Sequence, residues 1–189
     1  MQLLEQLSHS NPANATLREY LGEAYQITAQ LLQQKGNLDQ ALAYYRHANR
    51  VFAGLIANDR ANSLARNNFG STAVGMAREL LLQHEIQSAI TQARLAVATL
   101  ESIEHKNRYD IATQAQSYSA LGMAYEAMAD RESSPIKKTL RLREARSWLQ
   151  KSVATWQQEG TAYAKDQLEA DGARQELAKC ESALAKPRQ

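Results

Sequence analysis

The sequence repeats itself with a period of 48 residues, and this repeat restricts the possible folds more than any other feature. Leu21-Gly22 falls on Phe69-Gly70 when the chain is shifted by 48 positions. Self-similarity at a fixed period of this size indicates supersecondary units that stack on one another. A third copy is recognisable at Leu121-Gly122 and again at Ala145, with four extra residues before each of these positions.

Each copy divides into two helical segments. In the first copy, apolar residues follow helical spacing from Leu17 to Leu32, and Asn14 stands where an N-terminal cap is expected. Gly36 predicts the end of this helix. The segment Asn37–Gln40 has the pattern of a capping box, which predicts that a second helix begins there. Each copy is therefore expected to form an antiparallel hairpin of two long helices.

The composition supports an all-α chain. Eight glycines and three prolines are too few for a fold built from strands and tight turns. We predict the end of a helix at residues 1–10, belonging to a truncated preceding repeat of a longer parent, and helical hairpins at 14–58, 62–105 and 109–158. A C-terminal helix at 162–186 should cap the last hairpin with an apolar stripe formed by Leu168, Ala173, Leu177, Cys180 and Leu184.

A glycine recurs in the middle of the first helix of each copy, where it costs about 1 kcal/mol relative to alanine. We expect this cost to be offset by close approach of the partner helix at a small residue, with a tyrosine filling the space beside two of the contacts. The residues that carry this pattern are Gly22, Tyr25 and Ala41, then Gly70 and Ala89, then Gly122, Tyr125 and Ala145.

The order Leu-Gly-x-x-Tyr, a glycine turn, and an alanine in the second helix resembles the tetratricopeptide repeat. It is carried by Leu21-Gly22, Tyr25, Gly36, Ala41, Tyr45 and Ala48, and by the corresponding residues of the other copies. Both helices are longer than in the usual 34-residue unit of this family. The resemblance implies a right-handed superhelix of antiparallel hairpins that binds other proteins.

The long helices also resemble the tetratricopeptide arrays at the C-terminal ends of bacterial eukaryotic-like serine/threonine protein kinases. The junctions Ala13-Asn14 and Ala61-Asn62, the segment 144–156 and the segment 178–186 carry this second resemblance. It implies a regulatory or partner-recruiting region of a kinase. A free-standing adaptor or self-associating scaffold with no kinase attached is the alternative.

The family places the first helix of each hairpin on a concave surface, so the resemblance implies a peptide groove there. Because several of its side chains are acidic, we expect an extended or helical peptide partner with some basic groups. An ordinary solvated surface is the competing interpretation for each residue. The candidate groove residues are Glu19, Glu23, Gln26, Asn67, Ser71, Val74, Ser119, Met123 and Glu126.

Two further features lie near the end of the chain. Trp156 and Trp148 share one helical face, and Trp156 is expected in the core. A basic stretch consists of Lys137, Lys138, Arg141, Arg143 and Arg146. It is either the solvated side of a helix or a contact for a phosphate-rich or acidic partner.

Composition and motifs argue against several other functions. A net charge of +2 does not favour nucleic acid, and no run of 18 apolar residues predicts a membrane span. Neither a glycine-rich phosphate loop nor a paired nucleophile and base is recognisable, and the four histidines lack metal-ligand spacing. We therefore expect no catalytic residues, cofactor or metal, and predict a soluble cytoplasmic chain. If the parent protein has a membrane span between the kinase and the repeats, we expect the repeats to lie outside the cytoplasm instead.

Overall fold

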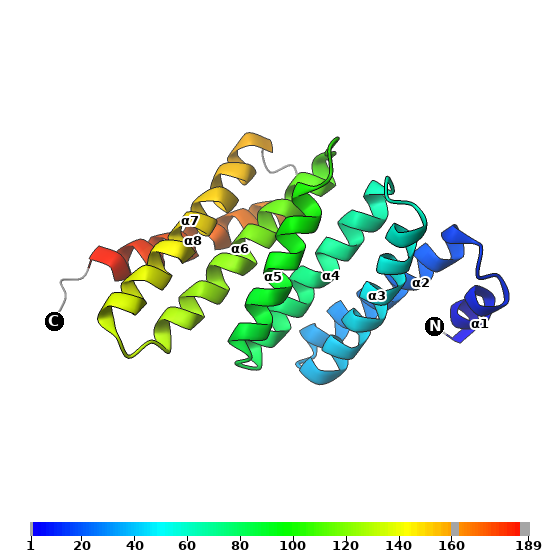
Figure 1. Ribbon diagram of the computed structural model, residues 1–189, viewed down its shortest axis with the longest axis horizontal. Coiled ribbons are helices and arrows are strands. Elements are labelled where there is room, and N and C mark those ends of the chain that lie inside the picture. Colours follow the sequence, from blue (N-terminus) through cyan, green and yellow to red (C-terminus); the bar gives the residue numbers. More distant parts are fainter. Residues whose placement is uncertain (1, 160–162, 186–189) are drawn as a thin grey trace.

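A computed structural model describes residues 2–159 and 163–185, with the side chain of residue 159 left out of the description. The prediction of an all-α chain is confirmed, since this part contains helices and no strand (Figure 1). The eight helices of the described residues are α1 (Gln2–Ser10), α2 (Ala15–Gln34), α3 (Leu38–Asn58), α4 (Ser63–Leu82), α5 (Ile86–Glu101), α6 (Arg108–Asp130), α7 (Pro135–Glu159) and α8 (Ala164–Ala185).

The helices lie side by side in a row along the long axis of the molecule, with α1 at one end and α7 and α8 at the other (Figure 1). Each helix packs on the next one in the chain, and α2 and α3, α4 and α5, and α6 and α7 have the most extensive contacts within each pair. In addition, α4 touches α2 and α6, and α6 touches α8. Within the described ranges α3, α5 and α7 make no such contacts with one another, so we call the α2–α4–α6–α8 side the inner face.

Asparagine caps begin several of the helices. The Asn14 side chain accepts a hydrogen bond from Leu17 N at 3.1 Å, and the Asn62 side chain accepts one from Ala65 N at 2.8 Å. The prediction of a capping box at Asn37 is wrong, because the Asn37 side chain makes no cap hydrogen bond. Asn37 is instead part of the turn that ends α2, in which its N–H donates to Leu32 O at 2.9 Å.

The two turns inside hairpins α2–α3 and α4–α5 have the same hydrogen bonds and different residues. Gly36 takes the left-handed position of the first turn with φ of +76°. His84 takes that position in the second turn with φ of +61°, and Glu85 N donates to Leu80 O at 2.8 Å. A positive φ is unfavourable for residues that have a Cβ, and glycine lacks one. The backbone at His84 is therefore strained, whereas the backbone at Gly36 is not.

The mid-helix glycines do allow close approach, but their partners differ from those expected. A Cβ on Gly22 would lie 2.7 Å from the Phe52 ring, and one on Gly70 would lie 2.6 Å from Leu100. The third, Gly122, faces Leu149 at 2.6 Å and the backbone oxygen of Ala145 at 3.2 Å. A large apolar side chain, rather than the small Ala41 and Ala89, therefore fills the space above the first two glycines.

Tyr25 and Tyr125 are buried beside these contacts, and each also ties its hairpin to the preceding helix. Tyr25 Oη donates to Glu5 Oε1 on α1 at 2.7 Å. The Tyr125 hydroxyl accepts from the guanidinium of Arg94 on α5. These tyrosines therefore join neighbouring elements as well as filling space.

The C-terminal helix packs mainly on α7 and also on α6. Ala170, Ala173 and Cys180 are buried, and Cys180 Sγ donates to Leu142 O at 3.2 Å. The expectation that Leu168 belongs to the covered stripe is wrong, because 74% of this residue is exposed. The first and last residues expected in this helix, 162 and 186, lie outside the described residues, as does residue 1 of the expected first segment.

The last hairpin positions both tryptophans. Trp156 is buried against Ala115 and Ala170, as expected, whereas Trp148 is half-buried and stacks on Tyr118 with ring centroids 5.9 Å apart. Within the described ranges, no helix is both long and apolar enough to cross a bilayer.

Candidate interaction surface

The α2 part of the candidate groove is half-buried. Glu19, Glu23 and Gln26 follow one side of α2, and Gln26 Nε2 donates to Ser71 Oγ on α4 at 2.9 Å. Burial and the neighbouring Glu23 raise the pKa of Glu19. This part of the inner face is acidic. The side-chain amide of Gln26 joins α2 to α4 and is not free to bind a peptide.

The α4 part is covered rather than open. Asn67 is buried, and its Nδ2 donates to Asp110 Oδ1 on α6 at 2.8 Å. Asp110 is itself buried and completes the capping box of α6. Val74 is buried as well. Asn67 and Val74 therefore hold α4 against its neighbours and offer little surface to a peptide.

The α6 part is partly covered by α8. Ser119 and Glu126 are buried, whereas Met123 keeps part of its surface exposed. Glu126 lies against α8, where burial and the carboxylates of Glu176 and Asp130 raise its pKa to about 7, although Lys179 acts against this rise. Of the nine candidate groove residues, Asn67, Val74, Ser119 and Glu126 are thus not accessible side chains.

A cleft of about 370 Å³ lies between α4, α6 and α8 on the inner face. Its walls are both apolar and charged, and include Arg78, Ser119, Met123, Leu168, Glu169 and Glu176. The structure therefore brings Ser119 and Met123 of the candidate groove together with residues of α8.

An ion pair spans the cleft. Arg78 donates two hydrogen bonds to the Glu169 carboxylate, at 2.7 and 3.1 Å, and both side chains are partly exposed. These residues lie 91 positions apart in the sequence. Two parallel hydrogen bonds between a guanidinium and a carboxylate fix their relative orientation, so this pair holds the first half of α8 at a set distance from α4.

Sequence reasoning missed Arg78, Glu169 and Glu176 because the cleft joins separate parts of the chain. The one available signal was Leu168, a large apolar residue near the start of the predicted capping helix. The apolar pattern predicts that Leu168 is covered, but it lines the open cleft.

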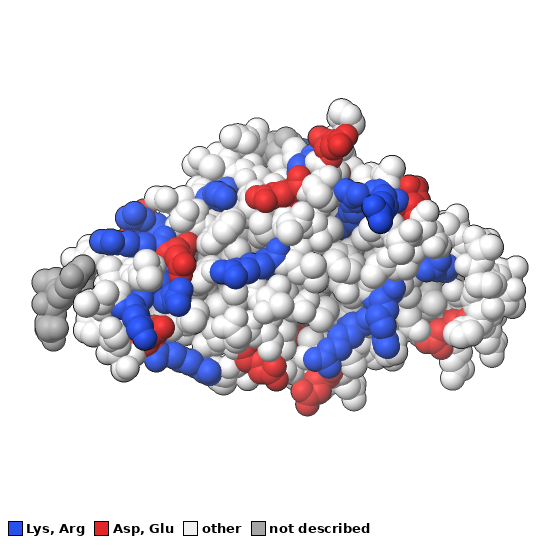
Figure 2. Space-filling model, viewed as in Figure 1, with Lys and Arg blue, Asp and Glu red and all other residues white. Residues whose placement is uncertain are grey.

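The opposite side of the molecule carries both basic and acidic side chains. Figure 2 shows the side with α5 and α7 in front, and Lys and Arg side chains are spread over it, with several near α7. Part of the basic stretch is paired there: Arg141 donates to Glu144 at 2.8 Å, and Lys138 lies 3.7 Å from Asp130. The basic stretch is thus partly neutralised by neighbouring carboxylates.

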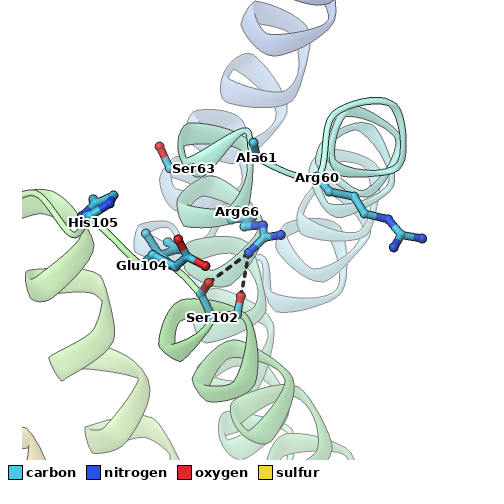
Figure 3. Close-up of a pocket in the computed structure, with 8 residues that line it drawn as sticks. Arg60, Ala61, Ser63, Arg66, Ser102, Glu104 and His105 are labelled. Carbon is cyan, nitrogen blue, oxygen red and sulfur yellow. Dashed lines mark hydrogen bonds between the residues drawn. The ribbon is translucent and has the colours of Figure 1, made fainter.

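A second cleft, of about 470 Å³, lies where the loop after α5 meets the start of α4. Arg66 lines it and donates to the backbone and side-chain oxygens of Ser102, at 3.0 and 3.1 Å (Figure 3). Arg60 points away from the other side chains in this view. The hydrogen bonds of Arg66 therefore hold the loop against α4. The labelled side chains do not converge on one point, as the groups of a binding site would.

No group of His, Cys, Asp and Glu in the described residues is arranged to hold a metal ion. Comparison with protein-family models, curated proteins and solved structures gives no match to this chain. The resemblance to tetratricopeptide repeats and to kinase C-terminal regions therefore stays a prediction.

Proposed function

We propose that this chain is a protein–protein interaction module that binds a peptide segment of its partner in the cleft between α4, α6 and α8. The observation that carries the proposal is the exposed Leu168 beside Met123, next to the carboxylates of Glu169 and Glu176. Apolar side chains that gather in a cleft with a charged rim are typical of binding sites, whereas a single exposed apolar residue is not. Glu169 is already paired with Arg78, and Glu176 lies 3.2 Å from the mostly exposed Lys179. The fitting partner is therefore a peptide with an apolar side chain and a lysine or arginine that replaces Lys179 at Glu176.

We further propose that the hairpins form a tetratricopeptide-like superhelix. The recurring contact of a mid-helix glycine with a large residue of the partner helix supports it, at Gly22, Gly70 and Gly122. We also propose that the chain is the regulatory or partner-recruiting C-terminal part of a bacterial serine/threonine protein kinase. The sequence resemblance alone supports that assignment, and a free-standing or self-associating adaptor is the alternative.

Site-specific photo-crosslinking tests the binding surface. Leu168 is replaced by p-benzoyl-phenylalanine, and the matched control carries the same replacement at Ile136 on α7, which is 75% exposed against 74% for Leu168. Irradiation of cells that make the chain should link one defined partner at position 168 and not at position 136. Equal labelling from both positions would refute the assignment of the cleft.

The chemistry of the partner is tested with the linked segment once it has been identified. Glu176→Lys and Leu168→Asp should each weaken binding of the synthetic segment about tenfold or more, because they remove the charge and the apolar contact respectively. Ile136→Asp should leave the dissociation constant unchanged. The gene region upstream of this chain then distinguishes a kinase C-terminal part from a free-standing adaptor.

A further inference from the structure

Large apolar side chains gather on the two helices at the N-terminal end of the row. Five of the 13 large apolar residues that are exposed in the described part of the chain belong to α1 and α2, which pack on each other (Figure 1). They are Leu3, Leu7, Tyr20, Ile27 and Leu31, and the exposed fraction of each lies between 39% and 68%. Isolated apolar residues on a surface are ordinary, whereas a group of them marks an interaction surface.

The residues of this group on α2 form one stripe. Tyr20, Ala24, Ile27 and Leu31 follow one another at spacings of four, three and four residues, which places them on one side of the helix. Tyr20, Ile27 and Leu31 each expose more than half of their surface, and Ala24 is half-buried between them. This spacing is the pattern by which two helices pack along their length.

The equivalent stripe on α4 is covered by a helix. The repeat of 48 residues places Gly75 at the position of Ile27, and a Cβ on Gly75 would lie 2.5 Å from the Tyr45 ring of α3. Nearby, Asn49 of α3 donates to Thr72 Oγ1 at 3.2 Å. Because α3 packs along this side of α4, the same side of α2 is suited to contact with a helix.

Only part of the α2 stripe is within reach of α1. This nine-residue helix corresponds to residues 50–58 of α3 in the repeat, so no part of it matches Tyr45 or Asn49. Nine residues extend over about 14 Å, whereas the 20 residues of α2 extend over about 30 Å. Ile27 and Leu31 therefore lie beyond the end of α1, in agreement with their exposure.

The stripe has neutral surroundings. Residues 24–34 include four glutamines and no charged residue. A side-chain amide both donates and accepts hydrogen bonds, so a surface of this kind can pair with an identical one, whereas two identical acidic or basic surfaces would repel each other. The chemistry of this end of the row therefore favours a second copy of the chain as its partner.

We propose that two copies of this chain form a symmetric dimer through α1 and α2, with the two α2 stripes packed in antiparallel orientation. The stripe has the same spacing when it is read in either direction, so this pairing places Tyr20 opposite Leu31 of the second copy and Ala24 opposite its Ile27. In this arrangement α1 of each copy lies beside the second half of the other α2, which covers Leu3 and Leu7.

The exposed area is sufficient for such a contact. At their exposures, the five large side chains leave roughly 500 Å² uncovered, which is more than half of the ~800 Å² that each partner of a standard interface buries. The glutamines and threonines beside the stripe supply further contact area. We expect a dimer that dissociates on dilution rather than a permanent one.

The charged residues of α2 are compatible with the antiparallel pairing. Glu23 lies opposite Thr28 of the second copy, and Lys35 lies opposite Thr16, about one turn from Glu19. The acidic residues of the two copies are therefore kept apart, and Lys35 of each copy lies near an acidic residue of the other. The dimer goes beyond the proposed function, because it uses the end of the row opposite to α8 and leaves the α4–α6–α8 cleft open.

The oligomeric state of the full chain tests this proposal. Sedimentation velocity between about 1 and 100 μM should show a dimer that dissociates on dilution. Ile27→Glu should raise the dissociation constant at least about tenfold, because it places a charge in the contact twice. Ile27 is exposed in the single chain, so the variant should keep the helicity of the wild type. The matched control is Ile136→Glu on α7, which should associate like the wild type.

A charge exchange tests the symmetry of the contact. Ile27→Glu and Ile27→Lys should each be mainly monomeric alone, and an equal mixture of the two should associate again, because position 27 lies close to the two-fold axis and the opposite charges can pair. Leu168→Asp should leave the dimer unchanged, so the dimer and the proposed function of the cleft fail independently.

A wild-type chain that is monomeric at about 100 μM would overturn the proposal. A dimer whose dissociation constant is the same in Ile27→Glu would overturn it as well, and a mixture that stays monomeric would refute the antiparallel pairing. If the purified chain is monomeric while a photo-crosslinker at position 27 links a different protein in cells, the stripe binds that protein and not a second copy.

Discussion

At the scale of single residues, the buried glutamate of α4 is the least expected feature of the core. Glu79 is fully buried, and neither of its carboxylate oxygens has a hydrogen-bond partner. Burial raises its pKa. A buried carboxyl group without partners is tolerated only as the neutral acid, so this side chain makes the stability of the fold depend on pH.

Replacement of Glu79 by glutamine should stabilise the protein at pH 7. Burial raises the pKa of Glu79, so the folded state binds this proton more tightly than the unfolded state does, and Glu79→Gln removes this difference. We expect the free energy of unfolding in urea to be higher for the variant than for the wild type at pH 7. The gain should shrink as the pH falls and vanish below the ordinary value of 4.5, where the carboxyl is protonated in both states.

The exposed loop residue Glu104 provides the control for this measurement. Glu104→Gln should change the free energy of unfolding by less than about 0.5 kcal/mol at either pH. If Glu79→Gln lowers stability at pH 7, the carboxylate has a stabilising role that burial alone does not explain.

At the scale of elements, helix ends were the most predictable feature. Asn14, Asn62 and Gly36 mark helix boundaries through hydrogen bonds and backbone preferences within a few residues, so they are readable without tertiary information. The contacts of α8 were less predictable. The sequence predicts its apolar stripe, but it does not predict the exposure of Leu168, which depends on how α8 packs on α7 and α6.

Removal of the last helix should destabilise the preceding hairpin. Ending the chain before Leu168 exposes Ala115 and Trp156, which pack against Ala170. We expect a loss of about 3–5 kcal/mol from the free energy of unfolding, estimated from burial of several apolar side chains. A lower melting temperature and a red shift of tryptophan fluorescence would report it.

Leu168→Ala is the control for this truncation, since Leu168 is exposed, and it should leave the melting temperature within about two degrees of the wild type. An unchanged melt of the truncated chain would contradict a capping role for α8.

At the scale of the whole molecule, each helix touches only its near neighbours in the row. The contact between α2 and α4 is small, and within the described residues α1 packs on α2 alone. The stability of such an array is approximately a sum over units and the interfaces between them. Damage to one hairpin should therefore spread only to adjacent elements.

Gly22→Val tests this local behaviour. A Cβ at position 22 would lie 2.7 Å from the ring of Phe52, so the branched side chain should separate α2 from α3 at a cost of about 1–3 kcal/mol. Hydrogen exchange should become faster in α1, α2 and α3 and stay unchanged in α6 and α7.

The reciprocal variant, Gly122→Val, should produce the opposite pattern, because it separates α6 from α7 at Leu149. A uniform loss of protection in both variants would show that the row unfolds as one cooperative unit.

The sequence by itself determined the all-α class and the helix boundaries, because caps, glycine turns and apolar spacing act over a few residues. The tertiary structure alone decided the partners of each helix. It placed Phe52 rather than Ala41 over Gly22, buried Asn67 against Asp110, and joined Arg78 to Glu169 across the inner face. These contacts depend on the angles at which helices cross, and the angles are set by side-chain packing summed over whole interfaces rather than by any local segment.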